Sequence, residues 1–528
     1  MSLKVLPFAF CILTFALSAG DAPQWGVTPD RNMISLEKNL PDSWSPGKKN
    51  EGTGEFDTSS AKNLKWVVKL GSQSYGNPTI SNGKIFVGTN NTSPRNPKIG
   101  QGATGPADNG DRGVTMCLEE STGKFLWQLT VPKLKSGKVN DWEFLGICGA
   151  ATIDGDRAYV VTNRCELLCL DVNGMANGND GPFKNEGQYI LDPDKLKGKG
   201  PEDFAKVPTD PTDADIIWRL DMMDELGVFP HNASNCSVLI DGDRLYTCTS
   251  NGVDWSHVNV PAAQAPSFIC VNKKTGEILW EDELGLADGS RLDCGLNRRI
   301  FHGQWTSPSM GVINGRKQVY FGGGDGFLYA LDAETGKAAW FADCVLPMHK
   351  KGQKGFIMYP DAKGPSEINA TPVFYKNRVY VANGQDPEHG EGVGVLTCLD
   401  ATKTGDITAT GKLWVYDKIN RSISTVSIID GLLFIADFSG YIHCLDAETG
   451  QPHWVHHTGA HMWSSTLAAD GKLYFGNEDG DAVVMAATKE KKEISKVNVD
   501  APIYGTPVVA NGVMYIASQT HLFAIQKK

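Results

Sequence analysis

Residues 330–340 read Ala-Leu-Asp-Ala-Glu-Thr-Gly-Lys-Ala-Ala-Trp, and this stretch decides the fold because the chain repeats it. Residues 444–454 are a second full copy. Each copy reads as a strand that ends in a small residue, a Thr-Gly turn and a further strand that carries tryptophan. A tryptophan of one sheet that packs against the small residue of a neighbouring sheet would bury both faces, so the repeat predicts sheets stacked on one another. The tryptophan slot of the looser copies is filled by Trp66, Trp127, Trp218, Trp280, Trp414 and, in one copy without tryptophan, Ile494.

A two-residue turn signal recurs between apolar, β-branched runs. Asn-Gly and Asp-Gly favour a type I′ hairpin, which needs positive φ at both central residues. The last two intervals between these signals are 40 and 41 residues (431 to 471 and 471 to 512), the period of a four-stranded propeller blade. The chain therefore predicts an all-β, eight-bladed β-propeller in which the N-terminal strand around Trp66 closes the last blade. The signals are Asn82-Gly83, Asp154-Gly155, Asp241-Gly242, Asn314-Gly315, Lys376-Asn377, Asp430-Gly431, Asp470-Gly471 and Asn511-Gly512.

The repeat carries a family resemblance. The unit Ala-Leu-Asp-x-x-Thr-Gly-x-x-x-Trp resembles the tryptophan-docking motif of the pyrroloquinoline quinone (PQQ) quinoprotein superfamily, over about residues 64–525. Residues 384–392 (Gly-Gln-Asp-Pro-Glu-His-Gly-Glu-Gly) look like a group of exported PQQ-like propellers of bacteria. The superfamily includes calcium- and quinone-dependent dehydrogenases as well as non-enzymatic propellers, such as the lipoprotein of the outer-membrane β-barrel assembly machinery. The resemblance implies the fold much more specifically than the function.

Composition and the N-terminus indicate the compartment. The 528 residues carry 50 Lys and Arg against 61 Asp and Glu, a net charge of −11, which argues against a nucleic-acid partner. Lys4 precedes an apolar run over residues 5–17 and the small residues 18–20, a pattern typical of a cleaved export signal and too short for a stable membrane anchor. We expect a signal peptide at 1–20, an N-terminal extension at 21–60 and one propeller domain at 61–528, in the periplasm or outside the cell.

Insertions between the repeats point to one functional face. Those near 89–113, 129–146, 219–234, 250–266, 281–304, 341–368 and 384–394 emerge on one face, and only 172–216 belongs to the other. Loops on a rigid scaffold carry binding residues. The residues that open each first strand are expected to ring the channel at this face, and they include Asn235, Trp305, Glu367, Asn369, Ser424, Trp463 and Ser464. Nearby loops add Arg298, Arg299, His302, His461 and the acidic residues Asp386, Glu388 and Glu391 around His389. The residues expected to bind any cofactor are Asn235, Arg298, Trp305, Glu367, Asn369 and Trp463.

Two functions remain open for this ring. Tryptophan, amide, carboxylate and guanidinium groups would clamp a flat, multiply charged ring such as PQQ, with calcium, in an alcohol or sugar dehydrogenase that passes electrons to a separate carrier. The same groups suit a rim that binds a protein, a polysaccharide or a small ligand. The chain has no Cys-Cys pair and no Cys-x-x-Cys-His, so we expect no attached haem. Residues 322–326 are glycine-rich but lie between strands, so we expect no NAD. The sequence therefore favours a binding scaffold.

Two further features concern metal and redox chemistry. Asp171, Asn173, Asn177, Asn179 and Asp180 gather oxygen ligands in a glycine-rich loop, which indicates a calcium site or simply a solvated loop. Cys236 and Cys248 are each six residues from Gly242, so a cross-hairpin disulfide is conceivable in an exported protein, although its geometry is often strained. Five other cysteines take the small-residue slot under the docking tryptophans and are expected to be buried thiols: Cys117, Cys169, Cys270, Cys398 and Cys444.

Overall fold

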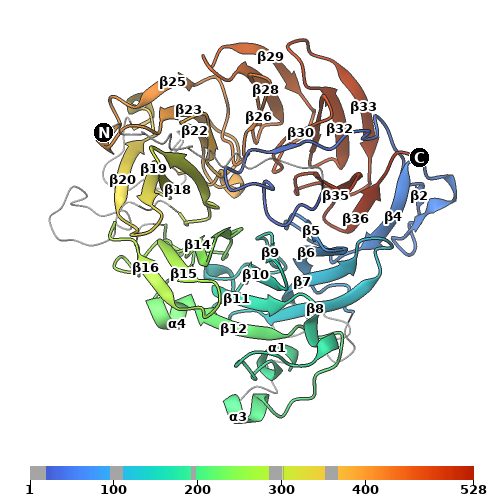
Figure 1. Ribbon diagram of the computed structural model, residues 1–528. Helices are drawn as coiled ribbons and strands as arrows, with labels where there is room; N and C mark the ends of the chain where they lie inside the picture. Colours follow the sequence, from blue (N-terminus) through green and yellow to red (C-terminus); the bar gives the residue numbers. More distant parts are fainter. Residues whose placement is uncertain are drawn as a thin grey trace, which may run out of the picture.

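Eight antiparallel sheets of four strands surround a central axis in the computed structural model of the chain (Figure 1). The structure describes residues 20–95, 111–191, 198–257, 259–284, 300, 302–350 and 367–528. Strand β4 (Leu64–Lys69) pairs with β36 (His521–Ile525), so the N-terminal part of the chain supplies the outer strand of the last blade. The predicted eight-bladed propeller and its closure by an N-terminal strand are thereby confirmed.

The first four blades follow one another along the chain. Blade 1 contains β5 (Thr79–Ser81), β6 (Lys84–Asn90), β7 (Arg112–Glu119) and β8 (Phe125–Pro132); blade 2 contains β9 (Thr152–Asp154), β10 (Arg157–Val161), β11 (Glu166–Asp171) and β12 (Ile216–Asp221); blade 3 contains β13 (Leu239–Asp241), β14 (Arg244–Cys248), β15 (Phe268–Asn272) and β16 (Ile278–Glu281); blade 4 contains β17 (Ser309–Ile313), β18 (Arg316–Gly322), β19 (Phe327–Asp332) and β20 (Ala338–Asp343), extended by β24 (Gly405–Asp406).

The remaining four blades complete the ring. Blade 5 contains β21 (Val373–Tyr375), β22 (Arg378–Asn383), β23 (Val395–Asp400) and β25 (Lys412–Tyr416); blade 6 contains β26 (Ser427–Ile429), β27 (Leu432–Ala436), β28 (Tyr441–Asp446) and β29 (Pro452–His457); blade 7 contains β30 (Leu467–Ala469), β31 (Lys472–Gly476), β32 (Asp481–Ala486) and β33 (Glu493–Asn498), with β1 (Ile34–Ser35) parallel to β30; blade 8 contains β34 (Val508–Ala510), β35 (Val513–Ala517), β36 and β4; β2 (Lys48–Lys49) and β3 (Phe56–Asp57) form a separate hairpin.

Helices are few and short in the described part of the chain. None of them combines the length and the apolar character needed to cross a bilayer. The insertion after β11 carries η3, α1 and α3 and projects from the edge of the ring beside blade 2 (Figure 1). The helical segments are η1 (Thr58–Ser60), η2 (Gly137–Val139), η3 (Gly174–Asn177), α1 (Gly187–Ile190), α3 (Pro201–Phe204), α4 (Met222–Leu226), η4 (Pro347–Lys350) and η5 (Pro387–His389).

The hairpin turns between the first two strands of each blade follow the predicted chemistry with two corrections. Asn82 and Gly83 both have positive φ (51° and 75°), as a type I′ turn requires. In blades 2 and 3 the central residues are instead Gly155-Asp156 and Gly242-Asp243, because Asp154 and Asp241 pair with the next strand and only the glycines have positive φ. Glycine at the first central position is typical of a type II′ turn.

The docking tryptophans occupy the interfaces between blades. Trp66 donates its indole N–H to the Glu120 carbonyl of blade 1 (3.1 Å), and its ring lies against Gly123. The small residue is the cross-strand partner of the tryptophan within its own blade, as in the pair Cys117 and Trp127. The neighbouring blade contributes the glycine of the Thr-Gly turn, where a Cβ would collide with the indole. The prediction that the repeat mediates packing between blades is therefore correct. The small residue, however, lies in the same blade as the tryptophan, and not in the neighbouring blade as expected.

Blade 7 lacks a docking tryptophan, and the N-terminal extension replaces it. Ser495, and not Ile494 as the repeat suggested, lies opposite Val484 in the tryptophan slot. The turn before β33 is one residue longer than in the full copies of the repeat, since Ala486 N–H donates to the Lys492 carbonyl whereas Asp332 N–H donates to that of Lys337. Trp44 is buried in the same apolar cluster as Val484 of blade 7 and Phe523 of blade 8. Its ring centroid lies 5.5 Å from that of Phe523. The extension thus fills the interface between blades 7 and 8.

Trp44→Ala is expected to lower the free energy of unfolding by about 3 kcal/mol, because it leaves a cavity of aromatic size between two blades. Leu36→Ala, at an exposed position of the same extension, should change it by less than about 0.5 kcal/mol. Denaturant unfolding followed by tryptophan fluorescence measures both. Equal losses for the two variants would show that Trp44 does not serve as a docking residue.

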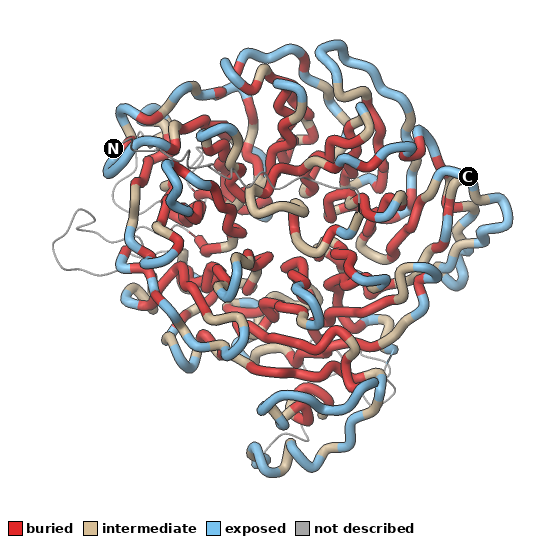
Figure 2. Tube along the Cα trace, in the orientation of Figure 1, coloured by how far each residue is buried: buried red, intermediate tan, exposed pale blue. Residues whose placement is uncertain are grey.

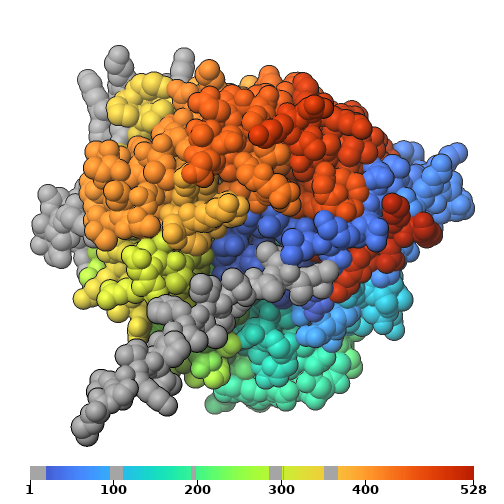
Figure 3. Space-filling view, turned by 45° about the horizontal axis from the view of Figure 1, so that its top comes forward, coloured from blue at the N-terminus to red at the C-terminus, as the bar shows by residue number. Residues whose placement is uncertain are grey.

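The extension also closes one end of the channel, where it binds the inner strands of all eight blades. In Figures 1 and 3 this blue segment runs across the middle of the ring. Trp25 of this segment lines the channel. Its bonds to blades 8, 1, 2 and 4 to 7 are Asn511 Nδ2 to Asp21 Oδ1, Ile80 N to Ala22 O, Ile153 N to Pro23 O, Met310 N to Pro29 O, Phe374 N to Asp30 O, Ile428 N to Asn32 Oδ1 and Ala468 N to Met33 O.

Arg31 is the fully buried cation at the middle of this closure. Its φ is positive (61°), and its guanidinium donates to the carbonyls of Pro308 (2.9 Å), Ser237 (3.0 Å) and Val238 (2.9 Å), and to that of Trp25 in its own segment. Burial lowers its pKa to about 10, so it stays charged at neutral pH. One side chain thereby joins the extension to blades 3 and 4.

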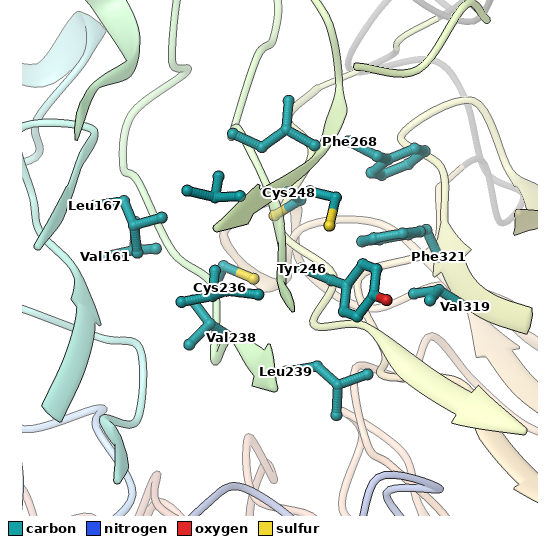
Figure 4. Packing of buried hydrophobic residues seen from close by; sticks show 14 of the residues in the cluster. Val161, Leu167, Cys236, Val238, Leu239, Tyr246, Cys248, Phe268, Val319 and Phe321 are labelled. Carbon is teal, nitrogen blue, oxygen red and sulfur yellow. The ribbon is translucent and has the colours of Figure 1, made fainter. Parts of the chain in front are cut away.

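The core runs through the inner three strands of the blades, which are buried while the outer strands and turns are exposed (Figure 2). Figure 4 shows Cys236 and Cys248 inside the apolar cluster shared by blades 2, 3 and 4. Both are thiols, and no disulfide joins any of the described cysteines. The five slot cysteines are buried, as expected.

Candidate functional site

A pocket of about 370 Å³ lies in the channel, where the segments that lead into the first strands of the blades converge. Since these segments enter from the edge opposite the Asn-Gly and Gly-Asp turns, the pocket opens on the face that carries most of the insertions. Trp25 of the extension lines it from within the channel. The pocket is therefore closed at one end and open at the other, and its volume lies in the range of small-molecule sites.

Two layers of side chains form the wall, and they are two residues apart along each blade. Residues i and i+2 of an extended segment point to the same side, so every blade supplies one residue to the outer layer and seven of the eight supply one to the inner layer. The outer layer consists of Tyr75, Cys148, Asn235, Trp305, Asn369, Ile423, Trp463 and Tyr504, and the inner layer includes Asn77, Ser237, Ser307, Thr371, Thr425, Ser465 and Thr506.

The aromatic side chains of the outer layer are held by hydrogen bonds at their polar edges. Trp463 donates its indole N–H to Glu478 Oε1 (2.7 Å), and the Tyr504 hydroxyl donates to the same oxygen (3.1 Å). The two rings stack with centroids 5.0 Å apart. Trp305 donates its N–H to the Ala233 carbonyl (3.0 Å). The polar edges of both indoles are thus engaged with the protein, which fixes the rings before any ligand arrives.

The inner layer forms a belt of hydrogen bonds between neighbouring blades. Backbone N–H groups donate to the side-chain oxygen of the next blade: Ser237 to Ser307 (2.9 Å), Thr425 to Ser465 (2.8 Å), Ser465 to Thr506 (2.8 Å) and, across the closure, Thr506 to Asn77 (2.5 Å). A hydroxyl has one donor and two acceptor sites. Each of these hydroxyls therefore keeps a hydrogen to donate to a ligand.

Charge in the pocket is acidic. Asp386 and Glu388 are the charged residues among the described lining residues, which include no Lys, Arg or His. Glu388 is exposed. Asp386 is buried, which raises its pKa to about 6 despite the Glu388 N–H that it accepts (2.9 Å). The pocket thus offers acceptors, neutral donors and aromatic faces.

The structure brings four of the six predicted site residues together in the lining of the pocket. Asn235, Trp305, Asn369 and Trp463 share the outer layer. Glu367 is fully buried outside the lining, and its Oε1 accepts bonds from the Asp386 N–H (2.7 Å) and from Asn369 Nδ2 (3.3 Å), so it positions the wall. Arg298 lies outside the described residues.

Sequence reasoning missed Tyr75 and Tyr504, although a signal was present. Both stand seven residues before the first central residue of their hairpin turn (82 − 75 = 7 and 511 − 504 = 7), as Trp463 does (470 − 463 = 7). Aligning the repeats on the observed turns gives the same spacing for every outer-layer residue except Trp305, which stands nine residues before Asn314 (314 − 305 = 9) because β17 is longer than the other first strands. Trp25 carries no such signal, because it belongs to no repeat.

The candidate calcium loop is held together by the protein's own groups. Asp171, Asp180 and Asp215 approach one another. Arg157 binds Asp171 (2.8 Å), and Lys184 binds Asn179. Asn177 donates to Asp180 (3.3 Å), and Asp171 accepts the N–H of Asn173 (2.7 Å). Calcium binding at this loop stays a prediction, and these internal contacts favour the solvated loop.

The fold defines the class: a PQQ-like β-propeller of eight blades, here with a pocket in its channel. Within that class, the chain belongs to the family whose model is described as outer membrane protein assembly factor BamB, which matches residues 207–456 and 440–528.

Relatives of known name lie at low identity. Lupanine 17-hydroxylase [cytochrome c] of Pseudomonas sp. is 24% identical over 518 residues, with 80% of this chain and 69% of that protein covered. Polyvinylalcohol dehydrogenase of Sphingopyxis sp. is 23% identical over 266 residues, with 46% of this chain and 37% of that protein covered. Among solved structures, BamB of Moraxella catarrhalis superposes with a TM-score of 0.51 at 15% identity, covering 88% of this chain and 97% of that one, which supports the fold.

Proposed function

We propose that this chain is an exported binding propeller whose channel pocket takes a neutral, polyhydroxylated small ligand or chain end of the sugar class. The observation that carries the proposal is the composition of the pocket. Rigid aromatic faces surround it, amides and hydroxyls ring it, and its described lining includes acids but no cation. Export rests on the charged and apolar pattern of residues 4–20.

A sugar ring matches these groups one by one. Its apolar C–H face packs on an indole or phenol ring, as Trp305, Trp463 and Tyr504 present here. Its hydroxyls both donate and accept, so they pair with amides such as Asn235 and with serine and threonine hydroxyls. The carboxylates of Asp386 and Glu388 accept strong hydrogen bonds from hydroxyl groups.

The described lining does not fit PQQ. The quinone that the resemblance implies carries three carboxylates, and binding it needs cationic partners or a bound calcium. The described lining has no cationic side chain, and Asp386 and Glu388 would repel an anion. Glu367, the carboxylate among the residues predicted to bind a cofactor, does not line the pocket.

A quinoprotein dehydrogenase is the competing function, and the two relatives, named as a hydroxylase and a dehydrogenase, favour an oxidoreductase. It requires that PQQ and calcium bind in the same pocket. A titration of the purified chain with PQQ in millimolar calcium, followed by the visible spectrum and dye-linked oxidation of alcohols and sugars, distinguishes it from the proposal.

The proposal predicts that the labelled chain binds neutral glycans on an array and does not bind uronate-rich or sulfated ones, since the pocket carboxylates repel anions. Isothermal titration calorimetry with the best neutral oligosaccharide should then give one site per chain. A parallel titration with PQQ and calcium should give no heat and no rise in melting temperature. Binding confined to anionic glycans, or saturable binding of PQQ, would contradict the proposal.

A further inference from the structure

Four histidines gather behind the pocket wall, outside its lining. His231 precedes blade 3, His257 lies on the connection between β14 and β15, His302 precedes blade 4, and His389 ends η5 in blade 5. The ring centroids of His231 and His302 are 4.2 Å apart, and those of His257 and His302 are 5.1 Å apart with the planes nearly parallel. His389 lies 5.1 Å from His302 and 5.5 Å from His257. Four connections of three blades thus converge on one cluster of imidazoles.

We propose that His231, His257 and His302 bind a transition-metal ion that prefers imidazole nitrogen, Zn²⁺ or Cu²⁺. Each offers one ring nitrogen, and the three nitrogens lie within 4.8 Å of one another. Imidazole suits Zn and Cu, whereas Mg and Ca prefer oxygen ligands. The site is separate from the sugar pocket, and its test does not depend on that proposal.

The hydrogen bond of His231 fixes which nitrogen faces the cluster. Its Nδ1 lies 2.7 Å from the Val253 carbonyl, which can only accept, so Nδ1 carries the proton and Nε2 presents a lone pair. A bond from the second nitrogen to a carbonyl is the usual way in which a protein orients a metal-binding histidine. Nε2 lies 3.0 Å from Nε2 of His302. Two nitrogens at this separation subtend roughly a right angle at an ion bonded to both at about 2.0–2.1 Å.

The backbone around the cluster is built to hold it. An isolated bridge joins Gly252 to Gly303, and the Val253 N–H donates to the His302 carbonyl (2.9 Å). A Cβ on Gly252 would lie 2.6 Å from both His231 Cβ and that carbonyl, so only glycine allows the approach. The segments that carry His231 and His302 are therefore fixed relative to each other without any ion.

The electrostatic surroundings keep the imidazoles in the form that binds metal. Burial, and after it the neighbouring histidines, lower the pKa of His231 to about 3 and that of His302 well below its ordinary value. Asp386 Oδ2 lies 3.5 Å from His302 Nδ1, and a carboxylate at this place offsets the charge of a bound cation. The rings of His302 and Trp305 also pack edge to face with their centroids 4.8 Å apart, so an ion bound to His302 would stabilise the wall of the pocket.

The test uses the full chain after removal of metal with a chelator. Calorimetry should show one Zn²⁺ or Cu²⁺ per chain and no binding of Mg²⁺ or Ca²⁺, and direct competition between Zn²⁺ and Cu²⁺ decides between the two ions. His302→Gln and His231→Gln should each weaken binding at least tenfold, while His453→Gln, on the exposed outer strand of blade 6, should leave it unchanged.

Absence of Zn²⁺ and Cu²⁺ binding by the wild-type chain would overturn the proposal and leave His231 and His302 as a hydrogen-bonded pair. Equal affinity of His302→Gln and wild type would do the same. If either variant fails to fold by circular dichroism, the coordination of the wild-type complex decides. X-ray absorption or Cu²⁺ electron paramagnetic resonance should show at least two imidazole nitrogens, and a shell of oxygen alone would contradict the site.

Discussion

Arg31→Ala is expected to lower the free energy of unfolding by about 5 kcal/mol or more, the largest effect of a single substitution in the chain. The guanidinium satisfies the carbonyls of Trp25, Ser237, Val238 and Pro308 in a fully buried place. Alanine leaves the carbonyls of Trp25, Ser237 and Pro308 without this donor, whereas that of Val238 keeps the Thr152 hydroxyl (2.7 Å). Each unsatisfied buried group costs about 1–3 kcal/mol. The substitution also removes the side-chain bonds that join the extension to blade 3, while blade 4 keeps the bond from Met310 N to the Pro29 carbonyl.

Arg31→Lys is the matched control, since it keeps the charge but has three donors on one nitrogen and cannot reach four diverging carbonyls with the same geometry. It should fall between wild type and alanine. Denaturant unfolding measures all three, and limited proteolysis should show the extension cleaved first in Arg31→Ala. If Arg31→Ala lowers the free energy of unfolding by less than about 1 kcal/mol, the closure of the channel by the extension does not stabilise the ring of blades.

Trp463→Ala is expected to weaken binding of a neutral oligosaccharide by about 2–3 kcal/mol, roughly 30- to 150-fold. The indole face is held against Tyr504 and fixed through Glu478, so it offers a rigid surface at little entropic cost. Trp305→Ala should have a similar effect from blade 4, and the double variant should show no measurable binding.

Trp255→Ala is the control for this series, because Trp255 is 51% exposed and does not line the pocket. It should change affinity by less than about threefold, within the range of a surface substitution. Calorimetry with the same oligosaccharide measures each variant, and thermal melting shows that each is folded. Unchanged affinity in Trp463→Ala and Trp305→Ala would place the ligand outside the channel.

Much of the fold could be predicted from the sequence because the repeats are local. A turn such as Asn82-Gly83 needs positive φ, and such a turn recurs in every blade, so the number of blades follows from the turns. In the full copies of the motif the tryptophan stands ten residues after the small residue, as in Ala330 and Trp340 (340 − 330 = 10). The same regularity places Asn235, Asn369 and Trp463 around one channel. Because each repeat in the sequence forms one blade, the ring of blades can be predicted from a single sequence.

The parts that could not be predicted depend on contacts between segments far apart in sequence. Arg31 bonds to carbonyls more than two hundred residues away, and Trp44 replaces the tryptophan missing from blade 7. His231 and His302 belong to connections that differ in length from blade to blade, so no spacing marks them as neighbours. The single-copy extension was set apart from the propeller for the same reason, because it matches no repeat.

The most direct measurement is a crystal structure of the chain with the best neutral oligosaccharide from the array. The proposed function predicts a sugar ring in the channel pocket, with its C–H face on Trp463 or Trp305 and its hydroxyls bonded to Asn235 or Asn369. Sugar bound on the outer surface with the channel empty, or the flat quinone in that pocket after co-crystallisation with PQQ and calcium, would contradict it.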